Sequence, residues 1–182
     1  MKKENKTGQN ECPTIKDSGA RTEFSTGAVR DIQEGKGRCD LLPLDVIADS
    51  YKANFGADNS IYFVFDQLAR FTQTGDSVHL HCALSGFLTD EENPFDHHWS
   101  AMFLEVAKHF EDGAKKYGEY NWQKGIPVRR YVDSAVRHYL KWLRGDEDER
   151  HDRAFCWNLL CACWTCKHKP ELNDYRKEEQ TG

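Results

Sequence analysis

Apolar residues recur at helical spacing in three stretches of the second half of the chain. Between residues 96 and 117 they fall at steps of three and four, which predicts an amphipathic helix. A second helix is predicted over 127–144, beginning with Pro127, a residue suited to a first helical position. The third stretch, 151–167, is apolar on nearly every side. That pattern is typical of a helix at the centre of a bundle or at an oligomer interface.

The first half of the chain has weaker patterns. A helix should begin near Pro43, after a loop rich in Gly and Arg. Residues 54–99 fit either strand or buried helix, and we favour mostly helix. Residues 1–22 and 170–182 are polar and predict a disordered N-terminal tail and a polar C-terminal tail. We therefore expect an all-α helical bundle with a single domain over residues 23–169.

Composition and charge narrow the possible functions. A net charge of −5 and a pI near 5.9 argue against a nucleic-acid-binding protein, which usually has a basic surplus. An acidic chain that handles phosphates normally does so through a metal ion. No apolar run approaches the length of a membrane span, and the N-terminus has no signal-peptide pattern. We expect a cytoplasmic protein whose seven cysteines are reduced.

The stretch GAKKYGEYNWQKG, residues 113–125, combines glycines, lysines and aromatic residues. Aromatic rings can stack on a nucleotide base, lysines attract phosphate, and glycines allow backbone N–H groups to approach a ligand. The alternative is a helix end closed by Gly118, followed by a turn that docks Trp122 on the core. From this segment alone the two interpretations are equally good.

Carboxylates and basic residues gather between residues 133 and 152. The acidic residues could bind Mg²⁺ or Mn²⁺, while Arg137 and His138 could contact phosphate. These acids are Asp133, Asp146, Glu147, Asp148, Glu149 and Asp152. The alternative is a solvated acidic loop, with Asp133 and Arg137 forming an ordinary helix ion pair.

Two further groups of residues could carry chemistry. On the polar side of the 96–117 helix, a spacing of four, seven and eleven residues places four side chains on one face: Glu105, His109, Asp112 and Lys116. The segment CACWTCKH, residues 161–168, contains four potential zinc ligands. However, Cys161 and Cys163 point about 200° apart on a helix, so we interpret these cysteines as buried apolar residues.

Four segments, in order along the chain, resemble the phage-type dATP/dGTP diphosphohydrolase family, which is related to all-α MazG-type nucleoside triphosphate pyrophosphohydrolases. The segments are FSTGAVRDIQEGKGRCDLLP, GAKKYGEYNWQKG, DSAVRHYLKWLRGD and HDRAFCWNLL. They cover roughly residues 24–52 and 100–168. Three departures stand out: residues 54–99 resemble an insertion, the paired Glu-x-x-Glu and Glu-x-x-Asp motifs are not present in clean form, and Asp152 and Arg153 replace small residues.

The resemblance implies a hydrolase that converts dATP or dGTP to the monophosphate and pyrophosphate with Mg²⁺ or Mn²⁺. It implies metal-binding and catalytic roles for Glu105, Asp133 and Asp148, with His151 as a further metal ligand. The substrate-binding residues that it implies are Lys116, Tyr117, Asn121, Trp122, Arg137, His138 and Asn158. A homo-oligomer in the host cytoplasm of a phage is expected. The alternative is a non-enzymatic interaction protein that binds a host factor through its third helix, or zinc through its cysteines.

Overall fold

The computed structural model describes residues 19–33, 39–56, 59–89 and 99–176. Its helices are α1 (Leu44–Phe55), α2 (Ser60–Thr74), α3 (Val78–Leu88), α4 (Trp99–Tyr117), α5 (Val128–Arg144) and α6 (His151–His168). The short 3₁₀ helices are η1 (Cys39–Leu41), η2 (Asn121–Lys124) and η3 (Pro170–Leu172), and the strands are β1 (Arg21–Glu23) and β2 (Val29–Asp31). The predicted all-α class is confirmed.

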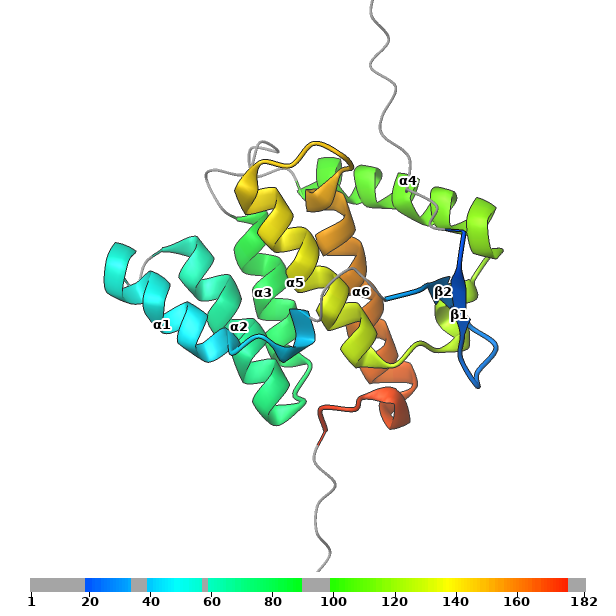
Figure 1. Ribbon diagram of the computed structural model, residues 1–182, viewed down its shortest axis with the longest axis horizontal. Helices are drawn as coiled ribbons and strands as arrows, with labels where there is room; N and C mark the ends of the chain where they lie inside the picture. Colours follow the sequence, from blue (N-terminus) through cyan, green and yellow to red (C-terminus); the bar gives the residue numbers. More distant parts are fainter. Residues whose placement is uncertain (1–18, 34–38, 57–58, 90–98, 177–182) are drawn as a thin grey trace, which may run out of the picture.

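Helices α5 and α6 form the centre of the fold. In Figure 1, α1, α2 and α3 lie on one side of this pair, while α4 and the β1–β2 hairpin lie on the other. Helix α6 is buried along most of its length, as its nearly uniform apolar pattern predicts. The three predicted C-terminal helices are all present. Pro127 precedes the first residue of α5 rather than occupying it, because its ψ of 134° is extended.

The segment that we predicted to be mostly helix, residues 54–99, contains α2 and α3 and contributes to the main core. Phe65 and Phe87 are fully buried there. The Phe87 ring lies 4.8 Å from that of Phe155 on α6, and the Phe65 ring lies 5.3 Å from that of Tyr139 on α5. Edge and tilted contacts of this kind stabilise a core beyond the burial of apolar area. Part of the predicted insertion is therefore integral to the bundle.

The β1–β2 hairpin was not predicted. Its strands pair antiparallel, with Thr22 opposite Arg30, and the turn contains Gly27 at a φ of 74°. Each strand has only three residues, too few to show an alternating apolar pattern. Arg21 and Thr22 thus belong to a strand, although we assigned them to the N-terminal tail. The remainder of that predicted tail, residues 1–18, lies outside the described residues.

The C-terminal segment also differs from the predicted polar tail. Tyr175 is buried, and its ring lies 5.3 Å from that of Phe71 on α2. The Asn173 side-chain amide donates a hydrogen bond of 2.8 Å to the carbonyl of Gly75. Residues 170–176 therefore pack on the end of α2, held by one aromatic side chain that a composition-based prediction overlooks. No helix in the described ranges is long and apolar enough to span a membrane.

Candidate active site

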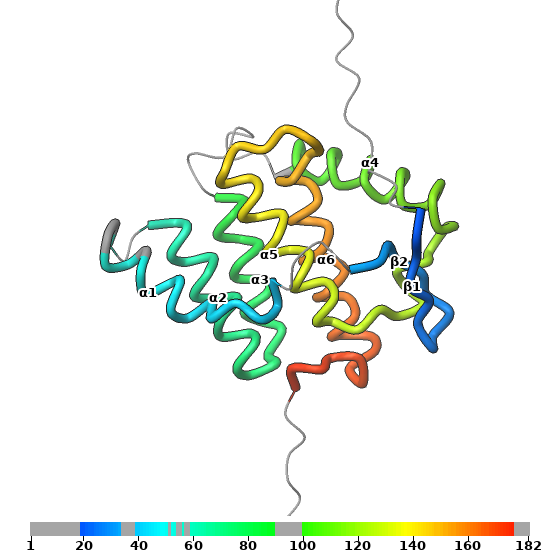
Figure 2. The backbone as a smooth tube through the Cα atoms, in the orientation of Figure 1, coloured from blue at the N-terminus to red at the C-terminus, as the bar shows by residue number. Residues whose placement is uncertain are grey.

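A cavity of about 940 Å³ lies among β2, α4, η2, α5 and α6. Figure 2 shows how this arrangement arises, because α4 and the hairpin stand beside the central pair of helices rather than inside it. Arg30, Arg130 and Arg137 contribute positive charge to the lining, and Trp122 and Trp157 contribute aromatic surface. A cavity of this size, with charged side chains beside aromatic rings, can hold a small polar ligand.

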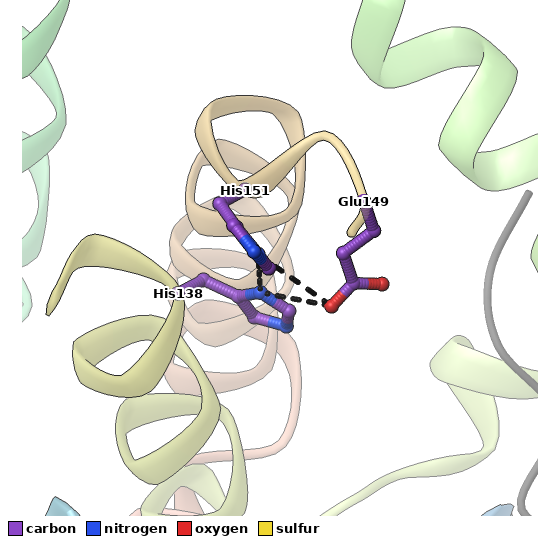
Figure 3. Close-up of side chains that lie close together, drawn as sticks. All are labelled: His138, Glu149 and His151. Carbon is purple, nitrogen blue, oxygen red and sulfur yellow. Dashed lines mark hydrogen bonds and ion pairs between the residues drawn. The ribbon is translucent and has the colours of Figure 1, made fainter. Parts of the chain in front are cut away.

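Three potential metal ligands converge at the wall of this cavity, as Figure 3 shows. His138 is on α5, Glu149 is in the loop after α5, and His151 is the first residue of α6. The two Nδ1 atoms of His138 and His151 are 3.0 Å apart. The Glu149 Oε1 atom lies 3.3 Å from the first of these nitrogens and 3.6 Å from the second.

The loop geometry explains how these side chains meet. Gly145 ends α5 in the left-handed conformation, with a φ of 80°, which favours glycine because it has no Cβ. Its N–H donates to the Trp142 carbonyl at 3.0 Å, and the N–H of Asp146 donates to that of Lys141 at 3.0 Å. The chain thereby turns back within six residues. As a result Glu149 and His151 face His138.

Asp148 orients His151. The Nε2 atom of His151 lies 2.8 Å from Asp148 Oδ1, a contact that fixes the ring with its Nδ1 atom towards His138 and Glu149. A second potential group joins His151 to Asp146 and Asp148. Those two carboxylates already face cations, because Arg144 pairs with Asp146, and Lys141 lies 3.2 Å from Asp148. The described residues include no Lys or Arg paired with Glu149. We therefore favour the group of His138, Glu149 and His151.

His138 is held in the neutral form. Burial lowers its pKa well below the ordinary value, and the nearby His151, His109, Arg137 and Arg30 lower it further. A neutral imidazole is the form that binds a metal ion. The donor set of two nitrogens and one carboxylate oxygen suits a divalent transition metal. Two of the separations, 3.0 and 3.3 Å, fall within the spacing of about 3.0–3.4 Å expected between neighbouring ligands around a metal at about 2.1 Å, and the third, 3.6 Å, is slightly longer.

Asp133 lies apart from this group. Its carboxylate pairs with Arg137 and also accepts the N–H of Asp40 at 3.3 Å. The ion pair predicted as the alternative is thus present, but Asp133 is only 3% exposed, so the pair is buried rather than solvated. Asp133 and Arg137 both line the cavity. Among the described residues, Asp133 joins no group of potential metal ligands.

The polar face of α4 meets the rest of the molecule at several points. Glu105 lies 3.4 Å from Arg150, and Asp112 lies 3.6 Å from Arg153. Lys116 pairs with Asp31 of β2 at 2.9 Å. The predicted shared face is therefore present. However, Glu105 does not line the cavity and is absent from the potential metal groups among the described residues.

Four of the predicted nucleotide-binding residues attach the hairpin to the bundle. The Tyr117 hydroxyl donates to Asp31 at 2.7 Å, beside the pair formed by Lys116. Asn121 donates to the carbonyl of Val29 and accepts its N–H, at 2.8 and 2.9 Å. Asn158 accepts a hydrogen bond of 2.7 Å from Arg30. Tyr117, Asn121 and Asn158 nevertheless line the cavity.

The 113–125 stretch has the features of a helix end with a docked turn, and it also lines the cavity. Gly118 ends α4 with a φ of 88°, and the Trp122 ring packs 5.3 Å from that of Phe110 and 5.0 Å from that of Trp164. These are the features of a helix end and a docked turn. Tyr117, Tyr120 and Trp122 also line the cavity. The stretch is therefore a packed turn that forms one wall of the candidate site.

The Cys-rich segment does not form a potential metal group among the described residues. Cys161 and Cys163 are buried, and burial raises the pKa of the Cys163 thiol to about 12. The cysteines thus behave as small apolar residues. Because α6 is buried in the bundle, it also offers little surface for a host factor, which weakens the binding mode of the non-enzymatic alternative.

Sequence reasoning missed four residues at the site. Glu149 was one of several acids in a charged run, and only the loop geometry distinguishes it from its neighbours. Arg30 and Trp157 were not singled out. His109 was placed on the polar face of α4, yet it is 8% exposed and lies against the Trp157 ring. The family resemblance in FSTGAVRD was the one available indication of Arg30.

The fold and site define a helical-bundle protein with a potential metal centre beside a cavity lined by both arginines and carboxylates. Residues 89–175 match the family described as dATP/dGTP diphosphohydrolase, N-terminal. This match confirms the resemblance drawn from the motifs over the segment from α4 to η3. No curated protein and no solved structure matches the chain.

Proposed function

We propose that this protein hydrolyses purine deoxynucleoside triphosphates, dATP or dGTP, to the monophosphate and pyrophosphate with a divalent metal ion. The observation that carries the proposal is the convergence of His138, Glu149 and His151, the first two of which line a nucleotide-sized cavity. All three residues fall within the segment that matches the family. The choice of purine deoxynucleotides rests on that match.

The metal would be held by His138, Glu149 and His151, while Asp148 orients the His151 ring. When bound, it would neutralise charge on phosphate oxygens and lower the pKa of an attacking water. Two imidazole ligands favour Mn²⁺ over Mg²⁺, because Mg²⁺ prefers oxygen ligands only. This donor set supports the Mn²⁺ half of the predicted cofactor pair.

The remaining cavity residues would hold the nucleotide. Arg137 supplies positive charge beside the metal centre, and Asp133 fixes its position through the buried ion pair. Trp122 presents part of its ring to the cavity and could stack against the base. Tyr120 stands at the edge with 65% exposure and a φ of 55°, so its ring could cover an entering base.

A direct assay tests the proposal. The purified protein is incubated with each of the four deoxynucleoside triphosphates and with Mg²⁺, Mn²⁺ or a chelator, and released pyrophosphate is measured. We expect release from dATP or dGTP that requires metal and is faster with Mn²⁺. Release of single phosphate instead of pyrophosphate, or no turnover with any nucleotide and metal, would overturn the proposal.

A further inference from the structure

Arg30 lines the cavity, and the described residues include no carboxylate paired with it. It extends from β2, and its guanidinium carbon lies 5.2 Å from the centre of the Tyr131 ring and 5.8 Å from that of Trp157. Its Nη2 atom donates to Asn158 Oδ1 at 2.7 Å. Its Nη1 atom is buried and has no hydrogen-bond partner, and no described carboxylate lies within ion-pair distance of this guanidinium.

Two more buried polar atoms without partners adjoin Arg30. Within the described part of the chain, His109 Nδ1 and Trp157 Nε1 also make no hydrogen bond. The two rings are 5.2 Å apart, and both residues line the cavity with Arg30. Three elements, β2, α4 and α6, therefore bring three unpaired polar atoms around the Trp157 ring. Native proteins pair nearly all such atoms with protein groups, water or a ligand, so three of them at one cavity wall form a place where a polar ligand can bind.

The charge of Arg30 makes the same point. A guanidinium withdrawn from water without a counter-ion destabilises a folded protein. Burial lowers the pKa of Arg30, although the group stays protonated because an arginine has a very high intrinsic pKa. Arg30 also lines the same cavity as His138 and Glu149 of the potential metal centre, so one ligand in that cavity can reach both.

We propose that Arg30, with His109 and Trp157, forms an anion subsite that binds a phosphate group of the ligand in this cavity. Asn158 is a positioning residue, because its own amide donates to the Ala154 carbonyl at 2.8 Å while its oxygen holds Arg30. That the phosphate belongs to a deoxynucleoside triphosphate rests on the proposed function. The binding of an anion by itself does not.

The chemistry of the subsite favours phosphate over a nucleobase. Arg30 Nη1 and Trp157 Nε1 can only donate hydrogen bonds, and a neutral His109 can present a third N–H. A phosphate group offers acceptors only, so it can satisfy all three. An adenine edge places a donor beside its acceptor and would leave an unpaired atom here, whereas a guanine edge offers two acceptors, N7 and O6, for three donors. The hairpin therefore contributes a charged ligand contact from outside the segment that matches the family.

Binding of inorganic pyrophosphate tests the subsite without any turnover. Calorimetry in the presence of a chelator compares the wild type with Arg30→Met and Arg30→Lys. We expect Arg30→Met to weaken pyrophosphate binding at least tenfold, and Arg30→Lys to fall between the two, since lysine cannot hold Asn158 and the anion together. Arg70→Met, which removes an exposed arginine of α2, should bind like the wild type.

Thermal unfolding separates a ligand-binding arginine from a structural one. Without ligand, Arg30→Met should melt at or above the wild-type temperature, because it removes a charge that has no counter-ion. With pyrophosphate present, the wild type should gain stability and the variant should not. Trp157→Phe keeps an aromatic side chain but removes the five-membered ring with its Nε1 donor, so it should weaken pyrophosphate binding several-fold even if Arg30→Met does not fold.

Three results would overturn the subsite. The first is a wild-type protein that binds no pyrophosphate. The second is equal pyrophosphate affinity in the wild type and in the variants Arg30→Lys and Trp157→Phe. The third is Arg30-dependent binding of deoxyguanosine in place of pyrophosphate. Failure of the proposed function is a separate outcome. If the protein binds pyrophosphate through Arg30 but hydrolyses no nucleotide, the proposed function is wrong and the anion subsite stands. If Arg30→Met hydrolyses the nucleotide with wild-type KM and kcat, the proposed function stands and the anion subsite is wrong.

Discussion

His109 should make the folded protein sensitive to mild acid. Burial lowers its pKa to about 3, and the charges of Arg153 and Arg30 act in the same direction. The ordinary value, regained on unfolding, is 6.5. A lowered folded-state pKa means that the neutral ring contributes stability above pH 6.5, and that this contribution is lost as pH falls from 6.5 towards 3.

The size of the effect follows from these two values. At pH 5 the unfolded chain protonates His109 almost completely, while the folded protein does not. One and a half pH units below 6.5 correspond to about 2 kcal/mol at 1.36 kcal/mol per unit. Between pH 7 and pH 5 the wild type should therefore lose about 2 kcal/mol of unfolding free energy through this residue alone. His138, also buried and neutral, adds to the total loss.

The assay is urea unfolding at pH 7, 6 and 5 in buffers free of phosphate. His109→Phe preserves an aromatic ring against Trp157 and should lower the loss between pH 7 and pH 5 by about 2 kcal/mol relative to the wild type. His81→Phe changes an exposed histidine of α3 and serves as the control, with the wild-type dependence expected. Equal pH dependence in His109→Phe and the wild type would refute the reasoning.

Two other predictions concern buried groups. Asp133→Asn should lower the unfolding free energy by about 3 kcal/mol, because it leaves the partly buried Arg137 without the Asp133 carboxylate. Urea unfolding measures this loss, and a loss below about 0.5 kcal/mol would mean that the pair behaves as a surface ion pair. Cys163 should react with a thiol reagent at pH 8 about a thousandfold more slowly than a free cysteine, since burial raises the pKa of its thiol to about 12. Peptide mapping of the labelled protein measures the extent of reaction, and equal labelling of Cys163 in native protein and in urea would contradict the prediction.

Helices were predictable from the sequence because their signal is local. The apolar spacing in α4, α5 and α6 repeats over 17 to 19 residues, which is long enough to define a period. The hairpin has three residues per strand, and its stability comes from contacts with distant residues such as Asn121 and Tyr117. Composition and periodicity contain no record of such contacts.

The sequence indicated which types of residue form the candidate site, but only partly which of those residues meet in the fold. His138, Asp148 and His151 were named in advance, and the structure brings them together through the turn at Gly145. Glu149 could not be distinguished from Glu147, because which acid faces inward depends on the path of a six-residue loop. Glu105 was placed near the metal by analogy with a family motif, whereas in the fold it pairs with Arg150.

Arg30 shows a different limit. A charged residue in a polar loop normally indicates solvent exposure, and nothing local marks it as buried. Its significance appears only when the fold shows that the described residues provide no carboxylate for it. Unsatisfied buried groups are a property of the assembled structure, and they indicate function where local sequence rules fail.

Hydrolysis should depend on a metal held by His138, Glu149 and His151. Two variants of one loop test it most directly: Glu149→Gln removes the carboxylate that faces both imidazoles, and Glu147→Gln removes an exposed carboxylate two residues away. Pyrophosphate release from dATP and dGTP is measured for both over a range of Mn²⁺ concentrations. The account predicts wild-type turnover for Glu147→Gln, and for Glu149→Gln a loss of at least a hundredfold that excess Mn²⁺ only partly restores. Wild-type turnover and Mn²⁺ dependence in Glu149→Gln would contradict it.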